Sequence, residues 1–524
     1  MQVMSYAPFG AEGILIRIET DIRRGIPGVD ITGLAQGAVR EAKERVRAAF
    51  RNSGLSFPAD RILINLAPAG VRKEGAALDL PIAVSVMAAA GIIDLPQNIM
   101  VLGELELSGS LRPVRGVMAA IAAGLKAGIN GFIVPEENAR EAAILAEGKF
   151  FAAANLNETV HALFVMAGSG NLPENTPAET IIGELGESGS QSSFAGDFSE
   201  IRGQAKYKRA LEIAAAGAHN LLVFGPPGTG KTMLARRIPS IMPPLDIEEA
   251  LEVTRLHSLA AGINPSASET LITQPPFRCP HHSASAEGIL GGGRFVRPGE
   301  ITLAHWGILF LDEAPEFRSS VLQSLREPLE DRIVTIARAE GPVRLPADFQ
   351  LILAANSCPC GRFGAGNLEG ATDCFCTPDE MRRYWRKIGA ALLDRIELRI
   401  PVLTPEIDDL GKGPEEESRL IAVRTARAAG IQKTRFRGSN IRRNSGMNPE
   451  QIDQFCVLND SARNTLVRTA EIFSLSGRAY HAILKTARTI ADLEESENLK
   501  TVHIEEAVEC RRFGDDPYDI LSAL

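Results

Sequence analysis

The stretch LLVFGPPGTGKT, residues 221–232, decides the fold of the central part of this chain. Four apolar residues predict a buried strand, and they run directly into a glycine-rich loop that ends in a lysine and a threonine. Glycines let consecutive backbone N–H groups turn inward around phosphates, and the helix expected over residues 233–238 points its positive end at the same anion. The stretch therefore predicts an α/β domain that binds a nucleoside triphosphate.

Two side chains at the end of this loop have separate tasks. Lys231 is expected to reach the β- and γ-phosphate oxygens, and Thr232 to ligate Mg²⁺. Short glycine patterns also recur by chance, but the agreement of the motif with its strand and helix argues against chance here. The residues expected to hold ATP are Gly225, Pro226, Pro227, Gly228, Thr229, Gly230, Lys231 and Thr232.

Two further apolar runs end in polar residues suited to ATP hydrolysis. Residues 307–311 predict a second buried strand, which ends at Asp312 and Glu313. We expect Asp312 to complete the Mg²⁺ shell and Glu313 to orient and polarise the attacking water. An Asp-Glu pair alone is more often a solvated turn, so the interpretation depends on the phosphate loop upstream. Residues 350–355 predict a third strand, after which the amide of Asn356 could position the water or sense the γ-phosphate.

Length and composition restrict the class of protein. The chain has 524 residues, of which 45% are hydrophobic and 23% charged, and this length predicts roughly three or four domains. The net charge of −9 argues against an overall positive coat for nucleic acid, but not against a locally basic channel. No apolar run reaches the roughly 20 residues of a membrane helix, and the N-terminus lacks the basic and apolar regions of a signal peptide. We therefore expect a cytoplasmic protein with no membrane partner.

Four segments of different character follow one another along the chain. Residues 1–167 alternate apolar strands with helices, which predicts an α/β domain with its own core. Residues 168–195 are rich in Gly, Ser, Pro, Asn and Glu and are expected to form a flexible linker. Residues 196–403 contain the nucleotide-binding α/β domain, and residues 404–524 turn helical. The expected fold class is thus α/β multidomain with a helical C-terminal domain.

Motifs in several parts of the chain together resemble one family of nucleotide hydrolases. Besides the phosphate loop and Asp312-Glu313, they are IRGQ at 201–204, CPHH at 279–282, RPGEI at 297–301, LDR at 393–395 and LSGRAY at 475–480. With them the chain resembles AAA+ ATPases of the magnesium-chelatase-like branch, and most closely the ComM/YifB family, over nearly its whole length. The resemblance implies ATP hydrolysis with Mg²⁺, Ile201 and Gln204 beside the nucleotide, a helix-2 insertion over residues 282–297, and a helical lid over residues 404–524.

The resemblance also assigns roles to three residues that spacing alone does not. Asn356 matches sensor 1, Arg395 matches the arginine finger that reaches into a neighbouring subunit, and Arg478 matches sensor 2 in the helical lid. A planar, permanently charged guanidinium suits the charge that grows on the γ-phosphoryl group during hydrolysis. A finger in trans requires a homo-oligomer, typically a hexameric ring in this family. The alternative for both arginines is a surface ion pair, and residues 388–391 depart from the Ser-Gly-Pro that the group usually carries there.

A hairpin is predicted before the third strand of the nucleotide-binding domain. The extended runs 333–337 and 343–345 flank AEGP, which is typical of a turn. The resemblance points this hairpin into the pore of the ring, where Arg338 and Arg344 could meet DNA phosphates. Their alternative role is to keep an exposed hairpin in solution.

A basic stretch with interleaved aromatic residues lies at 382–387. Arg382 and Arg383 precede Tyr384 and Trp385, a composition suited to nucleic-acid contact. An amphipathic helix with a solvated basic face has the same composition, so both interpretations stay open.

Four of the seven cysteines gather in one short segment. Cys358 and Cys360 form one Cys-x-Cys pair, Cys374 and Cys376 form a second, and thirteen residues separate the two pairs. Four thiolates could close a tetrahedral Zn²⁺ site, which would be structural because no coordination position stays open. Gaps of one residue are shorter than the usual two, and the alternative is a loop with reduced cysteines.

The first segment resembles the Lon-protease-like fold found at the front of ComM-type proteins. The resemblance lies in INLAPA at 64–69 and LGEL at 102–105. Active Lon enzymes use a Ser nucleophile activated by a Lys. This chain has EGAA at 74–77 where the serine would fall and RGVM at 115–118 where the lysine would fall. We therefore expect a domain without the Ser-Lys dyad, which serves assembly or nucleic-acid binding.

Functions from different classes compete for this chain. The resemblance favours a ring-forming, ATP-driven motor on single-stranded or branched DNA, a helicase or branch-migration translocase in recombination or natural transformation. The alternative is a magnesium-chelatase-like ATPase that remodels a protein or a metal-insertion partner, and the Lon-like domain and the four cysteines weigh against it. A third class, an ATP-switched scaffold, is disfavoured by Glu313. Stimulation of ATP turnover by DNA separates the first class from the others.

Overall fold

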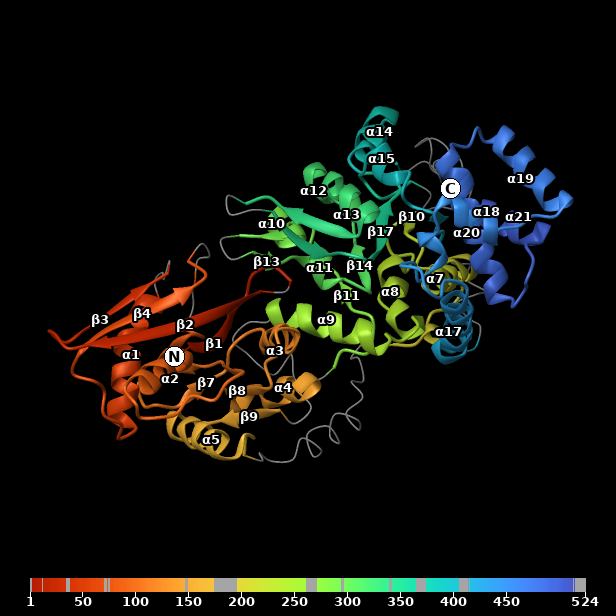
Figure 1. The fold of residues 1–524 in the computed structure, drawn as a ribbon. Helices are drawn as coiled ribbons and strands as arrows, with labels where there is room; N and C mark the ends of the chain where they lie inside the picture. Colours follow the sequence, from red (N-terminus) through yellow and green to blue (C-terminus); the bar gives the residue numbers. More distant parts are fainter. Residues whose placement is uncertain are drawn as a thin grey trace.

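The computed structural model describes most of the chain, and Figure 1 shows how its parts are arranged. The described residues are 2–11, 13–33, 38–69, 73, 76–146, 149–173, 196–260, 271–293, 296–338, 342–363, 374–404, 413, 415–511 and 513. Most of the linker expected over residues 168–195 lies outside these ranges. From left to right in Figure 1 follow an N-terminal α/β region, a central α/β region and a C-terminal helical region.

A mixed sheet of seven strands forms the N-terminal region, in the order β3-β4-β2-β1-β5-β8-β9. The strands are β1 (Gln2–Ala7), β2 (Ile14–Arg23), β3 (Gly28–Thr32), β4 (Arg61–Ala67), β5 (Ile99–Val101), β8 (Gly131–Pro135) and β9 (Phe150–Ala153). A short hairpin of β6 (Glu104–Leu105) and β7 (Leu111–Arg112) lies beside it. In β4, Ile62, Ile64 and Leu66 are buried, in line with the period of two of a strand.

Helices cover both faces of this sheet and give the region its own core. One face packs against α1 (Ala38–Asn52), α2 (Asp79–Ala89) and α5 (Leu156–Ser169). The other face packs against α3 (Val117–Lys126) and α4 (Ala139–Ala146). The expected N-terminal α/β fold is therefore confirmed.

A parallel sheet of five strands forms the central region, in the order β11-β14-β17-β10-β18. The strands are β10 (Leu221–Gly225), β11 (Phe277–Arg278), β14 (Ile308–Leu311), β17 (Gln350–Asn356) and β18 (Leu398–Pro401). Every residue of β10 and β14 is buried, which explains the continuous apolar runs in the sequence. Because the strands are parallel, their carboxyl ends meet at one edge, where Gly225 pairs with Asn356.

Short helices and two small hairpins surround the central sheet. The helices are α7 (Ala205–Gly217), α8 (Lys231–Ala235), α9 (Ile247–Ala260), α10 (Ala286–Leu290), α11 (Glu300–Leu303), α12 (Ser319–Ser324), α13 (Arg326–Asp331), α14 (Pro378–Arg386) and α15 (Ala390–Leu393). The hairpin of β12 (Gly291–Gly292) and β13 (Arg297–Pro298) lies in the expected insertion. The hairpin of β15 (Ile333–Ile336) and β16 (Val343–Pro346) follows the predicted one closely.

The helix after the phosphate loop differs from the one expected over residues 233–238. α8 already begins at Lys231 and ends at Ala235, and a 3-10 helix follows at Ile238–Ile241. In a continued α-helix the ring of Pro239 would press against the carbonyl of Ala235, so the helix ends there.

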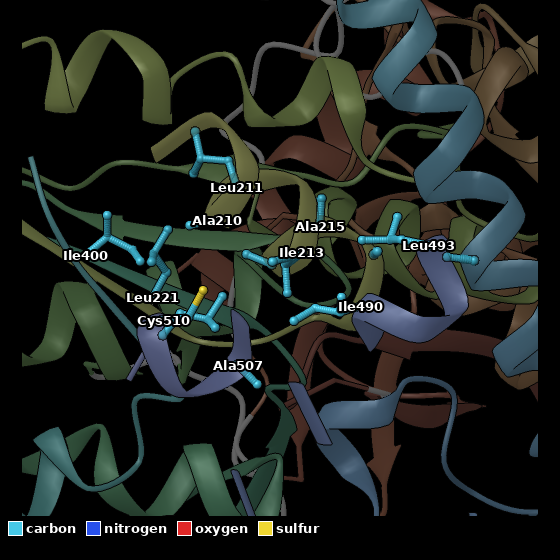
Figure 2. Packing of buried hydrophobic residues seen from close by; sticks show 14 of the residues in the cluster. Ala210, Leu211, Ile213, Ala215, Leu221, Ile400, Ile490, Leu493, Ala507 and Cys510 are labelled. Atoms are coloured by element: carbon cyan, nitrogen blue, oxygen red, sulfur yellow. The ribbon is translucent and has the colours of Figure 1, made fainter. Parts of the chain in front are cut away.

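The C-terminal region consists of helices that share a core with the central sheet. They are α17 (Ser418–Arg435), α18 (Pro449–Phe455), α19 (Asp460–Ile472), α20 (Gly477–Leu493) and α21 (Thr501–Glu509). Figure 2 shows Ile213 of α7 beside Ile490 of α20, and Ala507 of α21 belongs to the same cluster. The His219 ring contacts the hydroxyl of Thr489 at 2.7 Å in this core, and burial lowers the pKa of His219 to about 3. Among the helices described, none combines the length and the apolar character that a bilayer crossing demands.

Among the described residues, the N-terminal region contacts the central region at α9 and at the β15–β16 hairpin. Ser258 of α9 donates a hydrogen bond to Glu141 of α4, a buried carboxylate that also accepts one from the backbone N–H of Met118 at 2.9 Å. The turn after β1 brings Ala11 into the same apolar cluster as Val343 of the β15–β16 hairpin. The two α/β regions are thus joined through α9 and through the hairpin.

Candidate active site

The phosphate loop leaves the central sheet at the carboxyl end of β10. Gly228 and Gly230 have φ values of 79° and 87°, a left-handed conformation that glycine adopts without strain. Lys231 opens α8, and its Nζ donates hydrogen bonds to the carbonyls of Gly225 at 2.8 Å and Pro226 at 2.6 Å. Burial lowers the pKa of Lys231 to about 8, against the opposing charge of Asp312. The amine is therefore held inside the loop, where a phosphate would attract it.

The expected carboxylate pair, Asp312 and Glu313, lies directly beside this loop. The hydroxyl of Thr232 donates to Oδ2 of Asp312 at 2.7 Å, so the two expected Mg²⁺ ligands are already in contact. Glu313 follows with a φ of 50°, an uncommon conformation for a residue with a side chain. Its carboxylate is exposed, and its Oε2 lies 3.6 Å from Nδ1 of His282. This geometry leaves one face of Glu313 open to water and places an imidazole on another.

The expected sensor residue lies between these two elements. β17 pairs with β10 on one side and with β14 on the other, and Asn356 is its last residue. The parallel register puts Asn356 next to Gly225 at the carboxyl edge of the sheet. We call Lys231, Thr232, Asp312, Glu313 and Asn356 the phosphate-loop edge.

The IRGQ motif supplied two residues expected beside the nucleotide, and the structure places one at the phosphate loop and the other in the core. The side-chain amide of Gln204 donates to the carbonyls of Thr229 at 3.2 Å and Leu403 at 2.7 Å, so it touches the phosphate loop. Ile201 is buried in the core that α7 shares with the helical region. Its backbone carbonyl accepts a hydrogen bond from Lys208.

Arg395 and Arg478 converge on one acidic residue of their own chain. Glu330 Oε1 lies 2.6 Å from Nη2 of Arg395 and 2.5 Å from Nη2 of Arg478, and Arg478 also pairs with Asp394 at 2.9 Å. The hydrogen bond from Arg395, aided by the charge of Arg478, lowers the pKa of Glu330. In the part of the chain that the structure describes, both arginines thus make the ion pairs that the sequence left open as the alternative. We call Arg395, Arg478 and Glu330 the Glu330 surface.

The predicted pore hairpin has one apolar and one basic side. Val334, Val343 and Leu345 are buried in the central core, whereas Arg344, paired with Thr335, is exposed. Arg338 is partly exposed at the end of β15, and residues 339–341 between the strands lie outside the described ranges. The hairpin is therefore anchored through its apolar side and offers Arg344 on the other.

Helix α14 resolves the two interpretations of the basic stretch at 382–387. Tyr384 and Trp385 are buried, and the indole Nε1 of Trp385 donates to the carbonyl of Ser357 at 3.1 Å. Arg382 and Arg383 are exposed on the opposite side. The stretch is an amphipathic helix, so its aromatic rings cannot stack on bases, although its arginines stay open to phosphates.

The four cysteines come together despite the short gaps within each pair. Their sulfur atoms all lie within 4.8 Å of one another. Cys358 Sγ lies 3.3 Å from Cys360 Sγ and 3.6 Å from Cys374 Sγ. A tetrahedral ion with metal–sulfur distances of about 2.3 Å requires four sulfurs at such separations. Cys358, Cys360, Cys374 and Cys376 therefore form a candidate metal centre, and a thiolate set of this kind suits Zn²⁺.

His282 is a residue that the sequence interpretation assigned to the insertion and that the structure places 3.6 Å from Glu313. It lies four residues after the end of β11, which runs parallel to β14, so both strands lead toward the same edge of the sheet. The strand that brings His282 to this edge has only two residues, Phe277–Arg278, and a run of this length is too short to predict from the sequence.

Comparisons with known proteins agree with this architecture. The family described as "Magnesium chelatase, subunit ChlI" matches residues 197–410, "Subunit ChlI of Mg-chelatase" matches residues 18–138, and "Magnesium chelatase, subunit ChlI C-terminal" matches residues 415–511. YifB of Salmonella typhimurium is 39% identical over 97% of this chain and 96% of its own length. The competence protein ComM of Haemophilus influenzae is 38% identical over 97% and 96%. Lon protease 2 of Bacillus subtilis is 29% identical over 31% of this chain and 33% of its own length, which fits the Lon-like resemblance.

Proposed function

The chain belongs to the magnesium-chelatase-like AAA+ ATPase family that includes ComM and YifB, and from this membership we propose that it is a ring-forming, ATP-driven motor acting on DNA. Membership of the family implies ATP hydrolysis. The proposed activity is that of a helicase or branch-migration translocase on single-stranded or branched DNA in the cytoplasm.

One observation carries the ATPase part of the proposal, the 2.7 Å contact between Thr232 and Asp312 beside the buried Lys231. Thr232 and Asp312 would hold Mg²⁺, which would draw negative charge from the β- and γ-phosphate oxygens. Lys231 would leave its two carbonyl partners and pair with those oxygens. Glu313, oriented by His282, would accept a proton from the attacking water, and Asn356 would hold that water in line with the γ-phosphate.

The Glu330 surface supports a catalytic role across subunits. A pair of arginines that neutralises one exposed glutamate is well placed to exchange that partner for the phosphates of a neighbour. Each subunit would then offer its phosphate-loop edge to one neighbour and its arginines to the other. This head-to-tail arrangement closes into a ring, and we propose a hexamer.

The DNA part of the proposal is supported by the hairpin and by the named relative. Arg344 projects from the anchored hairpin, and Arg338, Arg382 and Arg383 add further positive charge. The Haemophilus influenzae relative is a competence protein, which favours a role in natural transformation or recombination. We also propose that the four cysteines bind structural Zn²⁺.

ATP turnover measured across DNA forms tests the proposal. We expect single-stranded or branched DNA to raise turnover above the basal rate, and the stimulation to fall as salt rises, because phosphate contacts release counterions. Double substitution of Arg338 and Arg344 by Ala should reduce the stimulation and leave the basal rate intact. Failure of every DNA form to stimulate turnover at low salt would refute the DNA motor and favour a protein-remodelling ATPase.

A further inference from the structure

We propose that the metal centre is a brace for the phosphate-loop edge, so that the metal is needed for ATP hydrolysis as well as for local folding. The inference rests on the proposed Zn²⁺ site and adds a task for it. In this view the ion holds Asn356 and Pro227 in their catalytic positions by joining the end of β17 to the start of α14.

The first link is the chain between the sensor residue and the cysteines. Asn356 ends β17, and Ser357 and Cys358 follow with no exposed surface at all. Since only Ser357 separates the two residues, the position of the Cys358 sulfur restricts the backbone of Asn356. A metal bound to Cys358 would therefore restrict the backbone position of Asn356, two residues away.

The second link returns from the cysteines to the phosphate loop through α14. This helix begins at Pro378, directly after Cys376 and the capping residue Thr377, whose hydroxyl accepts from the backbone N–H of Glu380. Its Trp385 donates a hydrogen bond to the Ser357 carbonyl and packs edge-on against Phe224, with ring centroids 5.8 Å apart. Phe224 immediately precedes Gly225, so α14 contacts the strand directly before the first residue of the phosphate loop.

The third link is a direct contact between the cysteine segment and the phosphate loop. The backbone N–H of Gly361 donates to the carbonyl of Cys358 at 3.0 Å, and Gly361 has a φ of 76°. A Cβ atom at this position would lie 3.2 Å from Cγ and Cδ of Pro227. Glycine is thus required by the left-handed backbone, and it also allows the turn between the cysteines to approach Pro227 closely.

Without a metal, the cysteine side chains themselves add little to this arrangement, which Trp385 also holds through its hydrogen bond to Ser357 and its packing against Phe224. Thiols are weak hydrogen-bond partners, and Cys360, Cys374 and Cys376 are not fully buried. A bound ion would instead join Cys358 and Cys360, which follow β17, to Cys374 and Cys376, which precede α14. Displacement of a positioning group by about 1 Å can lower a turnover rate about 10²-fold. Nucleotide binding depends mainly on the loop backbone and Lys231, so it should suffer less than hydrolysis.

The experiment compares full-length wild-type protein with a double variant, Cys374→Ser with Cys376→Ser. Zinc content is measured by mass spectrometry, the affinity for a fluorescent ATP analogue by titration, and kcat by phosphate release. We expect about one zinc per wild-type chain and none in the variant, with kcat lowered at least about tenfold and affinity changed only a few-fold. Cys456→Ser, in a buried cysteine of the helical region, is the control and should keep zinc and most of kcat.

Two single variants keep the test decisive if the double variant unfolds. Gly361→Ala and Trp385→Phe alter the second and third links but spare all four thiols, so both should retain zinc while kcat falls with a smaller change in nucleotide affinity. Full kcat in both variants, or full kcat in a zinc-free double variant, would overturn the brace and leave the zinc site standing. Wild-type protein purified without zinc would refute the zinc site itself, and the brace with it.

Discussion

The phosphate-loop edge and the Glu330 surface contain the two predicted halves of an ATPase site, and they are built in opposite ways. At the edge, three parallel strands end side by side, and the two expected Mg²⁺ ligands Thr232 and Asp312 already touch one another. At the Glu330 surface, the arginines meet a carboxylate of their own chain. The difference teaches that a parallel sheet brings its strand-end residues together within one chain, whereas the two arginines are held by an ion pair that any contact with a neighbouring subunit would have to replace.

The interpretation of the two regions as halves of one ATPase site fails if the Glu330 surface has no part in hydrolysis. Arg395→Ala should lower kcat about 10³-fold, because it removes a guanidinium that stabilises charge on the γ-phosphoryl group. The measurement is steady-state ATP turnover of the assembled protein. Arg427→Ala, an exposed arginine paired with Glu495 on the helical region, is the matched control and should keep full turnover.

Mixed assemblies decide whether this arginine acts across subunits. Lys231→Ala subunits cannot use their own phosphate loop but still supply Arg395, so mixing them with Arg395→Ala subunits should restore part of the activity. Mixtures no more active than either variant alone would place the arginine outside the neighbour's site.

The phosphate-loop edge is tested by removing its expected base. Glu313→Gln should lower kcat by about 10²- to 10³-fold and leave nucleotide affinity nearly unchanged, because the amide cannot accept the proton of the attacking water. Phosphate release and titration with a fluorescent ATP analogue report the two quantities. Glu316→Gln changes an exposed glutamate three residues away and should be silent; a Glu313→Gln protein with normal kcat would disprove the assigned role.

A smaller effect should follow from the buried amine of the same edge. The pKa of Lys231 is lowered to about 8, so the free protein loses this charge as the pH rises through 8. The phosphates need the protonated form, and the affinity for ATP should therefore be constant below pH 8 and fall up to about tenfold per pH unit above it. Nucleotide titrations between pH 7 and 9.5 measure this profile. Lys231→Arg keeps its charge throughout this range, and its profile should be flat.

Much of the edge could be predicted from the sequence, because continuous apolar runs mark parallel strands and the residues that follow them come together at one edge of the sheet. β10, β14 and β17 were found in this way, as was the hairpin before β17. The helix after the phosphate loop was expected to end at residue 238 but ends at Ala235, ahead of Pro239. The two residues of β11 were too few to predict that His282 lies beside Glu313.

Tertiary partners account for what remained open in the sequence. Burial of Trp385 turned a basic-aromatic stretch into one side of an amphipathic helix. The partner of Arg395 and Arg478 is Glu330, which lies 65 and 148 positions away along the chain and belongs to α13. No local pattern contains such a pairing, since only the fold brings Glu330 of α13, Arg395 after α15 and Arg478 of α20 together.

The smallest expected effect concerns Glu330, the carboxylate that pairs with both arginines. Glu330→Gln removes the charge that competes with a neighbour's phosphates for Arg395 and Arg478, so ATP turnover should rise by about two- to fivefold, the range that a partly exposed ion pair of about 0.4–1 kcal/mol allows. Turnover at saturating ATP measures the rise, and Glu327→Gln on the same helix should leave it unchanged. If Glu330 instead served only to stabilise its own chain, turnover would stay level or fall, and thermal unfolding would begin at a lower temperature. A rise without loss of stability would show that the ion pair restrains the two arginines in the single subunit.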